Sequence, residues 1–224
     1  DSACQALLQP MDSAEVLKFW FGRERKSWFE KNPALDKEIR CRFLPLYEQA
    51  IEGKLESWKQ AGASCLALVV LLDQFPRNMF RGSARAFAAD AMALEAANHA
   101  IARGHDRGML PIERQFIYMP LEHSESLADQ ERCLALMREI AVSPETADLP
   151  KWAEAHLAII RRFRQQHMAG PLDHHQAAAG NQLRELLPVL GRRHDVVRGD
   201  EHQGRAAQLA RGVRARRPGV AGVE

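Results

Sequence analysis

With 224 residues, the chain is long enough for one large domain, or for one domain with an appendage. Its hydrophobic content of 46% suffices for a sizeable core, and its formal net charge of +2 does not indicate a nucleic-acid partner. The longest apolar run, residues 65–72, is far shorter than the roughly 20 residues that span a bilayer. The first residues also lack the pattern of a signal peptide. The sequence therefore predicts a cytoplasmic protein without a membrane segment.

The cysteines are few and widely spaced, at positions 4, 41, 65 and 133. They form no Cys-x-x-Cys pair, so their spacing gives little support for a zinc site. A core of this size does not need a disulfide, which predicts free thiols in a reducing compartment. The chain also has no Gly-rich phosphate loop and no His-Glu-x-x-His motif, so we predict neither a metal nor a cofactor.

Helical signals begin with a capping side chain and a carboxylate three residues later, which predicts a first helix within residues 12–22. A second helix is predicted over residues 35–52, with a kink or break at Pro45. Residues 63–75 form the third predicted helix. It is apolar nearly all round, so we place it at the centre of the fold. Pro76 is expected to end it.

Four further helices are predicted, over residues 86–103, 111–119, 127–141 and 149–163, and no segment has the period-two pattern of a strand. Helix–turn–helix units of roughly 35–45 residues then predict an all-α, tetratricopeptide-like helical repeat of about seven helices, over residues 12–163. A bundle of this size buries its large aromatic side chains, here Trp20, Phe21, Trp28, Trp58 and Phe75.

A dense polar cluster directly follows the apolar third helix, and its members are Asp73, Gln74, Arg77, Asn78 and Arg81. An unpaired charge at the edge of a core is costly, so these groups need partners or a ligand. One interpretation is a binding site for a carboxylate or phosphate, since arginine offers a planar fork of donors. The other is an internal network that fixes the helix end, with Asp73 or Asp90 as the partner of an arginine.

A second cluster begins in the fifth predicted helix and continues into the loop before the sixth. Arg114 and Tyr118 share a helix face. His123 follows them in a loop, where it is a candidate general base with Glu125 or Asp129 as the carboxylate that orients it. The alternative is only a capped helix start, in which Ser124 or Ser126 is the N-cap and the histidine has no chemical role.

The composition changes after Phe163. Residues 164–224 contain no Phe, Trp, Tyr, Ile, Lys or Cys, and they carry ten arginines against six acidic residues. Little apolar surface is available there to hold a structure together. We therefore predict a disordered or weakly helical appendage, of the composition that out-of-frame translation of a GC-rich gene or a natural linker would give.

Three stretches in this order resemble one family: Phe19-Trp20-Phe21, then Leu72-Asp-Gln-Phe-Pro-Arg-Asn-Met-Phe-Arg81 with Ala86-Phe-Ala-Ala-Asp90, then Arg114-x-Phe-x-Tyr-x-Pro-x-x-His-Ser-Glu125. The family is the bacterial one of unknown function numbered 924. The resemblance covers residues 14–163 and implies an all-helical, tetratricopeptide-like fold without an established activity. It also implies a further stretch of the Arg-Phe-Pro-x-Arg-Asn type, where this chain has Arg-Gln-Gln-His-Met-Ala-Gly after Phe163.

Three functions are compatible with these patterns. The first is binding of a small anionic molecule or a peptide in a polar pocket lined by both clusters. The second is a hydrolase-type enzyme that uses His123 with a nearby carboxylate. The third is a scaffold for protein partners, which would need an exposed groove without converging charges. No nucleic acid, membrane or cofactor is expected in any of them, and the sequence leaves the oligomeric state open.

The change of composition generates a testable prediction. If residues 164–224 add little to the core, limited proteolysis should trim the chain to near Phe163 and leave the melting temperature almost unchanged. A fall of many degrees on truncation would show instead that this segment packs on the helical domain.

Overall fold

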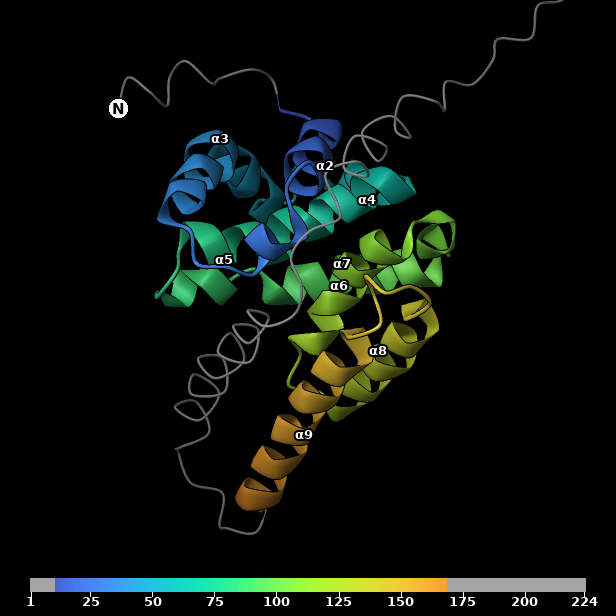
Figure 1. Ribbon diagram of the computed structural model, residues 1–224. Helices are drawn as coiled ribbons and strands as arrows, with labels where there is room; N and C mark the ends of the chain where they lie inside the picture. The colour runs from blue at the N-terminus through green and yellow to red at the C-terminus, as the bar shows by residue number, and fades with distance from the viewer. Residues whose placement is uncertain (1–10, 169–224) are drawn as a thin grey trace, which may run out of the picture.

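The computed structural model describes residues 11–168, with side chains as far as residue 164. Every regular element in that range is helical, which confirms the predicted all-α class (Figure 1). If the segments of residues 62–79 are counted as one continuous helix, the described range holds seven α-helices. The tetratricopeptide-like repeat stays a prediction. Most of the predicted appendage, from residue 169 on, lies outside the described residues.

The central element is the continuous helix that starts at Gly62. It consists of α4 (Gly62–Val69), a π-helical turn (Val70–Gln74) and α5 (Phe75–Met79). All side chains of residues 65–72 are buried. In Figure 1, α2 and α3 lie on one side of this helix and α6 to α9 on the other. The prediction that this segment is central is therefore confirmed.

The prediction that Pro76 ends the helix is wrong. A proline ring clashes with the carbonyl of the residue four positions earlier and cannot donate a backbone hydrogen bond. Here the backbone just before it widens to the π-helical spacing, with the N–H of Phe75 donating to the carbonyl of Val70. The wider turn makes room for the proline ring, so the chain continues as α5 to Met79.

Two helices form the layer on one side of the central helix. α2 (Ser13–Phe21) begins where the Asp12 side chain accepts a hydrogen bond from the backbone N–H of Glu15, as predicted. α3 (Pro33–Ile51) packs against α5 and runs through Pro45 without a break. Four short 3-10 segments connect the helices, namely η1 (Arg25–Trp28), η2 (Glu56–Gln60), η4 (Ala84–Phe87) and η5 (His105–Gly108).

The other layer consists of α6 (Asp90–Ala102), α7 (Pro111–Glu122), α8 (Leu127–Ile140) and α9 (Leu149–Met168). α7 packs against α4, α6 and α8, and α9 packs mainly on α8 (Figure 1). Ser126 caps α8 through the backbone N–H of Asp129, which is one of the two predicted caps. α9 extends five residues beyond Phe163, into the segment predicted as the appendage.

Aromatic side chains fill the space between the layers. Trp20 and Phe75 are fully buried, and their ring centroids lie 5.6 Å apart. Trp28 stacks on Trp20 and donates its Nε1–H to the backbone carbonyl of that residue, at 2.8 Å. Phe21 and Trp58 are only partly buried, although both pack against the core. The predicted burial therefore holds for three of the five aromatic residues and in part for the other two.

The cysteines only partly match the prediction. Cys65 and Cys133 are buried free thiols, whereas Cys41 is disulfide-bonded. A large core removes the need for a disulfide, but it does not prevent one from forming where two cysteines meet. Among the described residues, no helix has the length and apolar character needed to cross a membrane.

Candidate functional site

The site is built around a carboxylate within the central helix, at the point where the apolar run of that helix ends. Asp73 lies in the π-helical turn, and only 1% of its surface is exposed. A π-helical turn inserts an extra residue into the helical repeat and so changes the direction of the side chains around it. The sequence signal for this position was the abrupt step from apolar to polar residues at Leu72–Asp73.

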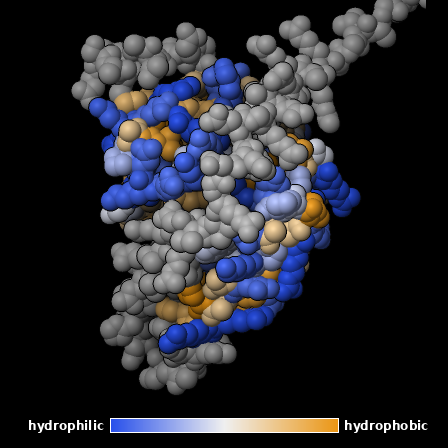
Figure 2. Space-filling view, in the orientation of Figure 1, coloured by the Kyte–Doolittle hydropathy of each residue, from blue (hydrophilic) through white to orange (hydrophobic). Residues whose placement is uncertain are grey.

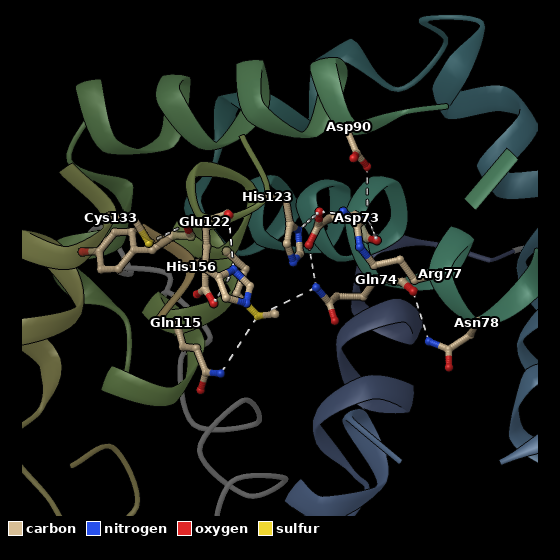
Figure 3. Close-up of polar contacts among 12 residues, drawn as sticks. Asp73, Gln74, Arg77, Asn78, Asp90, Gln115, Glu122, His123, Cys133 and His156 are labelled. Atoms are coloured by element: carbon tan, nitrogen blue, oxygen red, sulfur yellow. Dashed lines mark hydrogen bonds and ion pairs between the residues drawn. The ribbon is translucent and has the colours of Figure 1, made fainter. Parts of the chain in front are cut away.

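Three side chains contact the Asp73 carboxylate (Figure 3). His123 Nδ1 lies 2.8 Å from Oδ1, and Arg77 Nη1 lies 3.2 Å from the same oxygen. The carboxamide Nε2 of Gln74 donates to Oδ2 at 2.5 Å. Both carboxylate oxygens are thus hydrogen-bonded, which is what a buried carboxylate requires.

These neighbours control the ionisation of Asp73. Burial alone would raise the pKa of the carboxyl, but the positive charges of Arg77 and His123 and the hydrogen bonds from His123 and Gln74 outweigh it. The pKa of Asp73 is lowered from 3.8 to about 2. The side chain is therefore an ionised carboxylate at neutral pH, and it can only accept hydrogen bonds.

The ionised carboxylate fixes the tautomer of His123. Because Asp73 can only accept, the proton of a neutral imidazole must sit on Nδ1, which leaves a lone pair on Nε2. Nε2 forms no hydrogen bond with a residue of the described range, and 13% of the side chain is exposed. His123 is also the C-cap of α7, so the helix end fixes the position of the ring.

This pairing joins the two predicted clusters in an unexpected way. The carboxylate that orients His123 comes from Asp73, fifty residues earlier in the chain, instead of from Glu125 or Asp129. Asp129 accepts a hydrogen bond from the Ser124 hydroxyl at 2.7 Å, and Glu125 lies in the loop before α8. A contact between distant segments has no signature in local spacing, so the carboxylates predicted to orient His123 lay on the wrong element.

Arg77 connects the site to α6. Its Nη1 donates to the backbone carbonyl of Asp73 at 2.6 Å and contacts the Asp90 carboxylate at 3.0 Å. Asn78 donates to the backbone carbonyl of Gln74, again within the helix end. These contacts have the geometry of an internal polar network, which was one of the two interpretations of this cluster from the sequence.

The other two predicted arginines lie elsewhere. Arg81 forms a bidentate ion pair with Asp36 of α3. Its Nε donates to Oδ2 at 2.8 Å and its Nη2 donates to Oδ1 at 2.9 Å. Arg114 donates to the Tyr118 hydroxyl, which in turn donates to Asp106 at 2.6 Å. Each guanidinium thus has its own carboxylate, and the three arginines do not converge on one point.

Residues that the sequence analysis missed extend the polar region along α7. Gln115, Met119 and Glu122 are spaced four and three apart and so share one helix face. The Met119 sulfur lies 3.8 Å from Gln74 Nε2 and 4.0 Å from Gln115 Nε2. Glu122 pairs with His156 of α9, with 3.2 Å between Oε1 and Nδ1. The burial of Gln115 and Glu122 is visible only in the structure, and nothing local singled out His156.

These features define the class: an all-helical protein with a polar cluster at the centre of its core, built on a buried aspartate and a histidine. Residues 16–166 match the family described as "Bacterial protein of unknown function (DUF924)", and the chain belongs to this family. The resemblance predicted from the three sequence stretches is thereby confirmed.

A solved structure supports the same relationship. The chain is similar to a protein of unknown function from Agrobacterium tumefaciens, ATU0120, with 32% sequence identity and a TM-score of 0.63. The alignment covers 83% of this chain and 99% of that chain. None of the curated proteins matches the chain.

The network predicts a large stability cost for Arg77→Ala. Removing the guanidinium leaves Asp73 buried with one cation fewer, which typically costs about 3–5 kcal/mol. The matched control is Arg85→Ala, because Arg85 forms an exposed ion pair with Glu48 at 3.1 Å, and such pairs contribute about 1 kcal/mol or less. Urea unfolding of both variants beside the parent measures the difference. Equally small losses would mean that Asp73 does not depend on Arg77.

The lowered pKa of Asp73 predicts a specific acid sensitivity. A folded-state pKa below the unfolded value contributes stability above pH 3.8 and loses it as the pH falls toward 2. The contribution is about 2 kcal/mol at neutral pH. The unfolding free energy of Asp73→Asn should therefore fall less steeply than that of the parent between pH 4 and pH 2. Parallel curves would contradict this origin of the acid sensitivity.

Proposed function

We propose that this protein is a hydrolase-type enzyme in which His123 acts as a general base. The observation that carries the proposal is the hydrogen bond between the buried, ionised Asp73 and Nδ1 of His123. The bond holds the proton on Nδ1 and leaves Nε2 as the basic atom of a ring that is 13% exposed. A carboxylate that orients an imidazole in this way also stabilises the imidazolium that forms during proton transfer.

The reaction that fits this arrangement is attack by water. Nε2 of His123 takes a proton from a water molecule while the water oxygen forms a bond to an acyl carbon of the substrate. In the described range, no serine, threonine or cysteine is hydrogen-bonded to Nε2, so the proposal includes no covalent intermediate. The bond between the acyl carbon and the leaving group then breaks, giving a carboxylic acid.

Binding of a small anionic molecule is less well supported at this position. Arg77 is held between the carboxylates of Asp73 and Asp90, so the three groups together carry one negative charge. An incoming phosphate or carboxylate would have to compete with both aspartates for the guanidinium. The same consideration applies to an acidic peptide segment.

A scaffold for protein partners is also less well supported. The large apolar residues with high exposure are Ile51, Leu110 and Val142, which lie in separate segments of the described chain. On the face shown in Figure 2, apolar residues occur in small groups among hydrophilic ones. A docking surface for a stable partner usually has a contiguous apolar centre.

The test of the proposed function is hydrolysis of p-nitrophenyl acetate. We expect turnover by the parent protein and a loss of about 100-fold or more in kcat/KM for His123→Gln, the usual range for removal of a general base. His99→Gln is the matched control, since His99 is also partly buried but contacts the backbone carbonyl of Lys59 at a different place. Equal rates for His123→Gln and the parent would overturn the proposal.

A further inference from the structure

A second imidazole–carboxylate pair stands at the same end of α7. Nδ1 of His156 lies 3.2 Å from Oε1 of Glu122 and 3.5 Å from the backbone carbonyl oxygen of Glu122. Both atoms near Nδ1 are acceptors if the glutamate is ionised, so Nδ1 carries a proton and Nε2 is the variable position. His156 is 6% exposed and Glu122 is 7% exposed. The pair thus repeats the arrangement of Asp73 and His123 with groups from α7 and α9.

A series of contacts leads from the first pair to α7, the helix that carries Glu122. His123 bonds to Asp73, Asp73 to Gln74, and Gln74 to the Met119 sulfur. Met119 lies one turn before Glu122 on the same face of α7. Glu122 in turn contacts His156 of α9. Figure 3 shows His156 beside Glu122, and His123 beside Asp73.

The charge around the second pair is well defined. The other titratable group close to it is Cys133 of α8, and burial first, then the negative charge of Glu122, raises the pKa of that thiol well above its ordinary value. Cys133 therefore remains neutral. His156 is the basic side chain that contacts Glu122, with 3.2 Å between Nδ1 and Oε1.

Two buried amide oxygens beside these pairs lack a donor in the described range, Oε1 of Gln115 and Oε1 of Gln130. Gln115 is 4% exposed, and its Oε1 is buried without a hydrogen-bond partner in the described range, while its Nε2 makes only the weak contact with Met119. A buried carbonyl oxygen without a donor costs free energy, so its position calls for an explanation. A ligand that carries an N–H group would supply the missing donor.

We propose that His156 is the general acid of the site and that the substrate is a carboxylic amide. This rests on the proposed function of His123. As water attacks the acyl carbon and His123 Nε2 takes its proton, the carbon–nitrogen bond breaks and Nε2 of the His156 imidazolium protonates the departing nitrogen. The products are a carboxylic acid and an amine, and one proton returns from His123 to His156 through solvent. Amides need this second group, because an unprotonated amide anion is a very poor leaving group.

The test compares two substrates with the same acyl group, p-nitrophenyl acetate and p-nitroacetanilide. The nitrophenolate of the ester departs without a proton, whereas the nitroaniline of the anilide needs one. We expect His156→Gln to lower kcat/KM for the anilide by about 100-fold and for the ester by about threefold or less. His123→Gln should lower both. Glu122→Gln, which keeps the size of the side chain, is a second variant and should follow His156→Gln with a smaller loss.

Three results would contradict the proposals. Equal losses for both substrates in His156→Gln and Glu122→Gln, at an unchanged melting temperature of either variant, would show that the pair is structural and would overturn the inference. Cleavage of the ester alone by the parent protein would also overturn it and leave the role of His123 standing. If the parent cleaves neither substrate, the general base and the general acid are both refuted.

Discussion

The structure depends on how one buried carboxylate is compensated. Asp73 follows eight buried residues of the central helix, so its charge would be prohibitively costly without partners. Its compensation comes from two elements, Arg77 of α5 and His123 at the end of α7, and Arg77 also contacts the Asp90 carboxylate of α6. The position of these helices relative to one another is thus set by electrostatics as well as by apolar packing.

The backbone of the central helix makes this arrangement possible. The π-helical turn accommodates Pro76 and places two polar side chains, Asp73 and Gln74, inside the core without ending the helix. Helices usually bury polar residues only at their ends, where loops and water can satisfy them. Here the polar step lies within a continuous helix, and neighbouring helices supply the partners.

Local patterns predicted the elements well and their contacts poorly. Helix spacing gave the all-α class and the central place of residues 62–79, and the capping positions Asp12 and Ser126 were read correctly. The continuation through Pro76 was missed because the compensating π-helical turn has no clear sequence signature. The bond between His123 and Asp73 was missed because a long-range pair depends on how helices pack, which a single sequence does not encode locally.

The same contrast between predicted residues and missed contacts applies to the candidate site. Asp73 and His123, on which the proposed function rests, were both candidates from the sequence, but they were assigned to separate clusters. Glu122 and His156 were not candidates at all. Polar residues on a buried helix face, as at Gln115 and Glu122, are a signal that becomes visible only once burial is known. Burial, in turn, follows from tertiary packing.

The contacts of Arg77 also have an evolutionary consequence. One guanidinium is shared by two carboxylates, and one of these carboxylates also contacts His123, so four positions form a single connected unit. A substitution of Arg77 removes the cation that both carboxylates share, and one of these carboxylates, Asp73, is buried. Among related chains, positions 73, 77, 90 and 123 should therefore vary together or not at all, even where the surrounding apolar residues vary independently.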